Sequence, residues 1–149
     1  MAEYSAIAPQ TVNPGETIIF TATEVPGMNL IRHRDNTGNF LVSGYSPNFF
    51  SCPCRNRTVN YMVDFGANIA VPTGSAVGEI SVALTIDGAT IPGSTMTVTP
   101  AAVEQYFNVS RAINVDIFRG CCESVAVRNI SDIPILVQNA NIVFSRPDM

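Results

Sequence analysis

The most reactive side chains of this sequence are four cysteines, which come in two close pairs. Cys52 and Cys54 flank a proline in S-C-P-C, and Cys121 and Cys122 are adjacent in G-C-C-E. Four thiolates can hold zinc in a tetrahedron, although neither spacing is the usual C-x2-C of a zinc knuckle. An even number of cysteines also fits disulfide bonds between the two loops, whereas a cytoplasmic origin favours free thiols. The sequence leaves a metal site, disulfides and free thiols all open.

A single histidine is the candidate general base. His33 lies in the segment I-R-H-R-D. It would act with a cysteine only if the fold placed the two side by side, and we expect instead a surface histidine at the end of a strand. The sequence has no glycine-rich phosphate loop, no H-E-x-x-H and no G-x-S-x-G motif. We therefore expect no catalytic site and no cofactor, and we predict that the protein is not an enzyme.

Two aspartates stand among apolar residues in predicted strands. Asp64 and Asp116 are candidates for an acid–base pair of carboxylates or for calcium ligands. More often, such residues face solvent or pair with an arginine at an interface. Arg57 and Arg111 are candidate partners across a subunit boundary.

Aromatic and amide side chains recur in the predicted loops. An aromatic ring offers an apolar platform and an amide offers planar hydrogen-bonding groups, a combination that suits a sugar ring. The candidate ligand residues are Asn36, Asn39, Tyr45, Phe49, Phe50 and Tyr106. The same residues are also ordinary loop and rim residues, so glycan or receptor binding is an alternative to a purely structural role.

The elements that must position these residues are strands. Apolar and polar residues alternate with period two along most of the chain, as in half-buried antiparallel strands. Such runs cover residues 59–65, 80–86, 113–117, 125–127 and 136–144. Turn residues separate the runs, and Asp87-Gly88 is a strong hairpin signal. We predict an all-β sandwich of eight to ten strands.

The order of the segments is itself informative. A long strand (RTVNYMVDFGANIAVP) is followed by a hairpin (EISVALTIDGATIPGS), a polar run (TMTVTPAAVEQYFNVS), a strand pair (AINVDIFRGCCESVAVRN) and an apolar C-terminal strand (ILVQNANIVFSRP). This order resembles the trimeric jelly-roll family of tumour necrosis factor, complement globular heads and the tips of bacterial collagen-like spore-surface glycoproteins. The most specific piece, Thr85 to Ser94, is similar to an L-x-x-N-G-x-x-I-x-G-S segment of the bacterial members.

The resemblance implies a ten-stranded antiparallel jelly-roll sandwich that assembles as a homotrimer. Residues 1–11 are expected to form an N-terminal arm, and residues 12–149 a single domain. The family's C-terminal strand places Ile142 and Phe144 close to the three-fold axis. The resemblance further implies a structural or adhesive module on a particle surface. A phage head-fibre or decoration protein fits best, with capsid or other virion proteins as partners.

The pattern of apolar residues independently favours self-association. In the last run, alternation puts Leu136, Ile142 and Phe144 on one face, with Val137 and Val143 on the other. Because both faces of several strands are apolar, one face would form a large exposed patch unless another copy covered it. This pattern makes Met62, Phe118, Val137 and Val143 candidate interface residues, and the resemblance adds Ile142 and Phe144.

The composition narrows the partners. Charged residues make up only 13% of the 149 residues, about half the share of a typical soluble domain. The net charge is −4, so nucleic acid is not an expected partner. The N-terminus lacks the features of a secretory signal, and no apolar run is long enough to span a membrane. We expect a protein made in the cytoplasm and associated with a virion.

Overall fold

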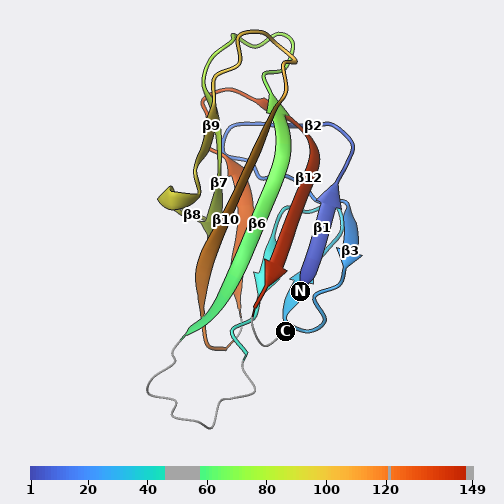
Figure 1. The fold of residues 1–149 in the computed structure, drawn as a ribbon, viewed down its shortest axis with the longest axis vertical. Coiled ribbons are helices and arrows are strands. Elements are labelled where there is room, and N and C mark those ends of the chain that lie inside the picture. The colour runs from blue at the N-terminus through green and yellow to red at the C-terminus, as the bar shows by residue number, and fades with distance from the viewer. Residues whose placement is uncertain (46–57, 121, 147–149) are drawn as a thin grey trace.

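Two antiparallel sheets of six strands each face one another across a single apolar core (Figure 1). The structure is a computed structural model, and it describes residues 1–45, 58–120 and 122–146. Sheet A contains β1 (Ala2–Ala6), β2 (Gln10–Val12), β3 (Ala22–Val25), β6 (Thr58–Ala70), β10 (Phe107–Phe118) and β12 (Ile135–Ser145). Sheet B contains β4 (Ile31–His33), β5 (Phe40–Val42), β7 (Ile80–Ile86), β8 (Ala89–Thr90), β9 (Met96–Val98) and β11 (Glu123–Asn129).

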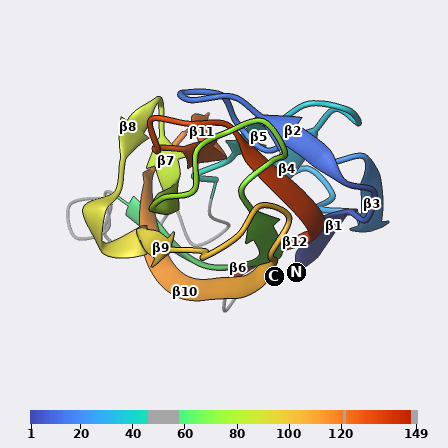
Figure 2. The same ribbon diagram turned by 90° about the horizontal axis from the view of Figure 1, so that it is seen from above.

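The strand order is that of a jelly roll. Sheet A runs β10-β6-β12-β1-β3 with β2 paired to β12, and sheet B runs β4-β5-β11-β7-β8 with β9 paired to β7. The chain therefore crosses repeatedly between the sheets, which lie face to face when seen from above (Figure 2). The predicted all-β sandwich is confirmed. The described residues form twelve strands, more than the eight to ten expected, because short pieces such as β2 and β8 carry too little alternation to be recognised.

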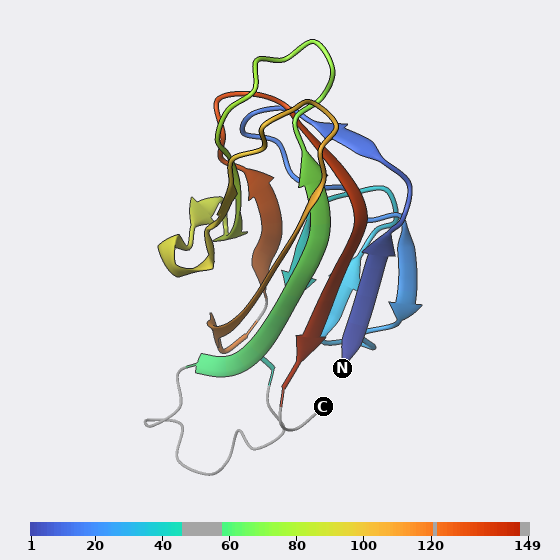
Figure 3. The ribbon, with the colours of Figure 1, turned by 45° about the horizontal axis from the view of Figure 1, so that its top comes forward.

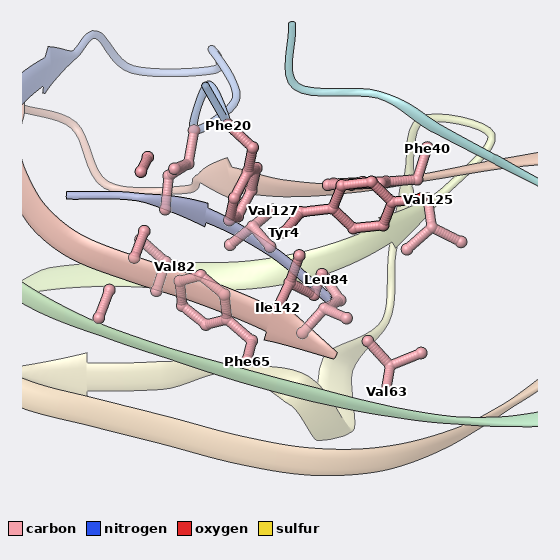
Figure 4. Packing of buried hydrophobic residues seen from close by; sticks show 14 of the residues in the cluster. Tyr4, Phe20, Phe40, Val63, Phe65, Val82, Leu84, Val125, Val127 and Ile142 are labelled. Atoms are coloured by element: carbon pink, nitrogen blue, oxygen red, sulfur yellow. The ribbon is translucent and has the colours of Figure 1, made fainter. Parts of the chain in front are cut away.

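The core follows from the period-two pattern. In β6, the side chains of Tyr61, Val63 and Phe65 are buried, whereas Met62 and Asp64 are exposed on the outer side. Figure 4 shows how residues of the two sheets interlock, with Val63 and Phe65 near Leu84 and Ile142. Together, these buried residues fix which side of each strand faces out.

The first residues of the chain belong to the sandwich. β1 lies between β12 and β3 in sheet A, with Ala2 opposite Phe144 and Ala6 opposite Ala140. Tyr4 is 2% exposed and packs against Phe40. The expected N-terminal arm is therefore wrong for residues 2–6. The five-residue strand was too short for its alternation to be distinguished from that of an arm.

A β-bulge in β12 reverses the assignment of faces along this strand. Gln138 pairs with Asn68 and Asn141 with Gly66, so β12 holds one more residue than β6 between these pairs. Asn139 takes up the extra residue with a φ of 52°. Val137 before the bulge therefore points inward, as do Ile142 and Phe144 after it (Figure 3 shows β12 beside β6).

Three of the six predicted interface residues are corrected by this geometry. Val137, Ile142 and Phe144 are each 0% exposed within a single chain, so they have no surface left for a partner. They are core residues of one sandwich. Met62, Phe118 and Val143 lie on the outer face of sheet A and stay candidates.

Within the described part of the chain, no helix has the length and apolar character needed to cross a membrane.

Candidate functional site

A row of outward side chains crosses the outer face of sheet B. β4 pairs with β5 so that Arg32 lies opposite Leu41, and β5 pairs with β11 so that Leu41 lies opposite Ser124. Because side chains alternate along each strand, the three neighbouring residues share one face. Arg32, Leu41 and Ser124 therefore form a continuous line over three strands.

His33, next to Arg32, faces the opposite way. Its side chain is 0% exposed and stacks on Phe40 with ring centroids 4.4 Å apart. Tyr4 and Phe20 pack against the same imidazole. Nε2 lies 3.0 Å from the carbonyl oxygen of Thr37. The expectation of a surface histidine is wrong. Side chains alternate along the three-residue strand β4, and His33 is one of those that point into the aromatic core. To act as a general base on a substrate, His33 would have to lie on the outer face of sheet B.

Two open cavities adjoin the row, and both are lined by Arg32 and Leu41. The first, of about 310 Å³, also has Leu30, Tyr45 and Cys122 in its wall. The second, of about 570 Å³, extends over Arg34, Asn39 and Ser124. Their sizes lie in the range of small-molecule sites. We call the two cavities together the Arg32 groove.

Close backbone packing positions Tyr45 at one end of the groove. The amide of Gly44 donates a hydrogen bond of 2.8 Å to the carbonyl of Gly120. A Cβ atom at Gly44 would collide with the backbone of Phe118, so only glycine allows this approach. The carbonyl of Tyr45 accepts a hydrogen bond of 2.8 Å from Nη1 of the buried Arg146. These two hydrogen bonds fix the backbone of Gly44 and Tyr45, while Tyr45 stays 62% exposed.

The polar groups of the groove are free to bind. Within the described ranges, the guanidinium groups of Arg32 and Arg34 form neither a hydrogen bond nor an ion pair with the protein. Asn39 accepts a hydrogen bond of 3.3 Å from the Ser124 hydroxyl through Oδ1, which leaves its amide nitrogen to donate elsewhere. The groove therefore offers cationic and amide donors next to an exposed ring.

The structure divides the predicted ligand residues. Asn39 and Tyr45 both line the Arg32 groove, and Asn36 lines a separate cavity beside Thr17. Tyr106 precedes β10 at Phe107, whereas Gly44 packs near Phe118 at the other end of that strand. A twelve-residue strand separates its ends by roughly 36 Å, so Tyr106 does not belong to the site. Phe49 and Phe50 lie outside the described residues.

The groove contains residues that sequence reasoning did not select. Arg32, Arg34 and Leu41 are not among the ligand residues that the sequence predicts. In the structure, Leu41 is an exposed apolar residue of β5. Since β4 and β5 span three residues each, their alternation is too short to show which residues face out. Only the pairing of β4, β5 and β11 brings these side chains together.

The structure defines the chemical state of one of the four cysteines. Cys122 is disulfide-bonded. Cys52, Cys54 and Cys121 lie outside the described residues, so the pairing and the weaker zinc alternative are not tested for them. Among residues 1–45, 58–120 and 122–146, no group of three or more histidine, cysteine, aspartate or glutamate side chains is placed to hold a metal ion.

The two aspartates are not an acid–base pair. Asp64 lies opposite Ala112 in the β6–β10 ladder, and Asp116 lies opposite Asn60. Four residues of β10 between the two levels amount to roughly 13 Å. Asp116 accepts a hydrogen bond of 3.0 Å from the Asn60 amide. Both carboxylates lie on the outer face of sheet A, which is a candidate surface for association.

That outer face is largely uncharged and partly apolar. Phe118 is 66% exposed and Met62 is 37% exposed. Val143 of β12 points to the same face of sheet A. The outward positions of β6, β10 and β12 carry asparagine, glutamine and serine, with Asp64 and Asp116 as their charged residues and no arginine. Arg111, an expected salt-bridge residue, donates instead to the Thr95 carbonyl at 3.3 Å. Arg57 lies outside the described residues.

Comparison with known proteins supports the fold and goes no further. The chain is similar to the globular domain of zebrafish complement 1qA protein, with a TM-score of 0.56 and 10% identity over 95% of this chain and 94% of that one. It is also similar to a sugar-binding protein, the C-terminal domain of EclA, with a TM-score of 0.37 and 12% identity over 94% of this chain and 68% of that one. The second likeness is too low to indicate a common fold. No protein-family profile and no curated protein matches the sequence.

The first likeness, together with the strand order, shows that this chain has the jelly-roll fold of the complement globular domain. A shared fold does not carry a shared ligand. The function must therefore be argued from the two outer faces of this chain.

Proposed function

We propose that the protein is a non-enzymatic module that self-associates as a homotrimer and serves a structural or adhesive role on a particle surface. The observation that carries this proposal is the outer face of sheet A, which exposes Phe118 and Met62 among amide side chains and the two carboxylates of Asp64 and Asp116. A face of this kind is costly to leave in water and suits burial against another copy.

The number of copies rests on the resemblance of the sequence to trimeric jelly rolls. Three-fold closure would place the same face of each copy toward the shared axis. A phage virion is the particle we favour, with capsid or other virion proteins as partners, and this choice rests on the same resemblance.

Native mass spectrometry tests the assembly. Three chains of 16.0 kDa give a trimer of about 48 kDa. In the double variant Met62→Arg with Phe118→Arg, two charges enter the proposed interface, and we expect a 16.0 kDa monomer. Val77→Arg changes an apolar residue that is 46% exposed in a loop, and should leave the trimer intact. A monomeric wild-type protein would rule out the assembly.

A second candidate function is carbohydrate binding, which the Arg32 groove favours. An exposed tyrosine, an exposed leucine and free amide and guanidinium donors line this surface. The groove is on sheet B and the proposed interface is on sheet A, so the two roles are compatible in one molecule. Binding of the protein to a glycan array tests this role, and Tyr45→Ala should weaken the signal several-fold.

A further inference from the structure

We propose that the Arg32 groove binds a saccharide that carries a carboxylate, such as a uronic or sialic acid residue, and that Arg32 pairs with this carboxylate. The proposal rests on the carbohydrate-binding role given above as the second candidate function, and it specifies the ligand class. It does not depend on the trimer.

The first step is the position of Arg32. Of the described residues that line the two cavities, Arg32 and Leu41 are the two that both cavities share. Its guanidinium has no hydrogen-bond or ion-pair partner among the described residues. A planar guanidinium presents paired N–H donors that match the two oxygens of a carboxylate. A ligand that spans both cavities would therefore meet an unused carboxylate-binding group at its centre.

The second step is the state of the acidic residues nearby. In a protein of net charge −4, free carboxylates beside the groove would compete with an acidic ligand. Asp35 lies next to Arg34 in the chain and accepts from the Thr23 hydroxyl at 3.3 Å. Two other acids are held by backbone amides: Asp87 accepts from Ser124 at 2.8 Å and Glu123 from Phe118 at 3.1 Å. All three accept hydrogen bonds within the protein, and none of them pairs with Arg32 or Arg34, so both guanidinium groups stay available to a ligand.

The third step is a platform for a ring. Tyr45 and Leu41 are 62% and 45% exposed, and both line the first cavity together with Arg32. A pyranose ring has an apolar face of C–H groups that packs on aromatic and aliphatic side chains, with hydroxyls left for amide donors. Asn29 in the first cavity and Asn39 in the second supply such amides. These features favour an acidic sugar over an acidic peptide.

Titration calorimetry with matched ligands tests the charge. The probes are oligogalacturonate and its methyl ester, and sialyllactose and lactose. We expect at least one acidic probe to bind and its neutral counterpart to bind about ten- to a hundredfold more weakly, as for loss of a charge-assisted hydrogen bond. Equal binding of the acidic and neutral members of a pair, or no binding of any probe, would overturn the proposal. A polyglutamate peptide that binds as tightly as the saccharide would overturn the ligand class.

Matched variants test the site. Arg32→Gln should lower the affinity about ten- to a hundredfold. Arg32→Lys should recover part of the affinity, because lysine restores the positive charge but not the paired N–H donors of a guanidinium. Tyr45→Ala should weaken binding several-fold. Arg111→Gln and Tyr106→Ala remove the same groups elsewhere and should bind as wild type. If either control weakens binding as much as its partner variant, the ligand binds elsewhere and the proposal fails.

Native mass spectrometry of the same samples separates the two proposals. A trimer that binds no probe refutes the groove alone, and a monomer that binds acidic saccharide refutes the trimer alone. Circular dichroism shows that each variant is folded, and Arg32→Gln should fold, since the exposed Arg32 side chain forms no hydrogen bond or ion pair with the described residues.

Discussion

Arg32 and His33 are neighbours in the chain and end in opposite environments. The arginine stands on the outer face of sheet B, and the histidine lies among the rings of Tyr4, Phe20 and Phe40. Alternation requires opposite faces for the two residues, but it does not say which one is buried. The aromatic residues contributed by β1, β5 and the segment before β3 decide this, and each lies outside the three-residue strand that holds Arg32 and His33.

Tyr4 gives this aromatic cluster a pH dependence. Burial raises the pKa of Tyr4 above its ordinary value of 10.0, and a hydrogen bond with the backbone of Gly27 offsets part of the shift. The folded state therefore holds this proton more tightly than the unfolded state, so the free energy of unfolding should fall as the pH rises above about 10. Urea unfolding between pH 8 and 11 should show a smaller fall for Tyr4→Phe than for wild type. Tyr45→Phe, which alters an exposed residue, is the control, and equal slopes for wild type and Tyr4→Phe would contradict the assignment.

The disulfide at Cys122 should stabilise the fold and the wall of the Arg32 groove. Replacing a disulfide cysteine generally costs about 2–4 kcal/mol, so Cys122→Ser should lower the free energy of unfolding by this amount. Alkylation of the unreduced protein followed by peptide mapping should find Cys122 unlabelled and identify its partner. Labelling of Cys122 without reductant would show a free thiol and exclude the disulfide.

The bulge in β12 matters most among the secondary-structure elements. One extra residue at Asn139 exchanges the two faces of the strand, so Val137 and Phe144 both point into the core although they differ in parity. A strict period of two cannot describe such a strand. The sequence offered a weak signal in Asn139 itself, because asparagine tolerates a left-handed backbone better than most residues.

Substitution at Asn139 tests the role of the bulge. Asn139→Val places a β-branched residue at a φ of 52° and should lower the free energy of unfolding by about 1–2 kcal/mol. Asn139→Gly accepts the same conformation and should stay within about 1 kcal/mol of wild type. Chemical unfolding of the three proteins measures the difference. A valine variant as stable as the glycine variant would mean that the strand re-registers without the bulge.

The long strands were predictable and the short ones were not. β6, β7 and β10 show enough alternation to reveal their class and their inner faces. The three-residue strands β4 and β5, which build the Arg32 groove, gain their conformation from pairing with β11. For the same reason, Asn39 and Tyr45 were found from their chemistry, whereas Arg32 and Leu41 required the pairing.

At the scale of the whole molecule, the two outer faces differ in chemistry. Sheet A presents amides and exposed apolar residues without arginine on β6, β10 and β12, and sheet B presents Arg32 and Tyr45 around open cavities. The two sheets pack face to face across the core, so their outer faces point in opposite directions (Figure 2). A trimer closed through sheet A would therefore leave three Arg32 grooves facing outward.

This arrangement predicts avidity. Three linked grooves that engage one densely coated surface should bind about 100- to 10,000-fold more tightly than one groove binds a single ligand. Surface plasmon resonance on chips with increasing density of an acidic saccharide should show this gain for the wild-type protein. The double variant Met62→Arg with Phe118→Arg should keep the affinity for free ligand and lose the dependence on density. Arg32→Gln should lose both while it stays trimeric. A monomeric variant with undiminished avidity would show that the apparent gain comes from rebinding at the surface and not from three linked grooves.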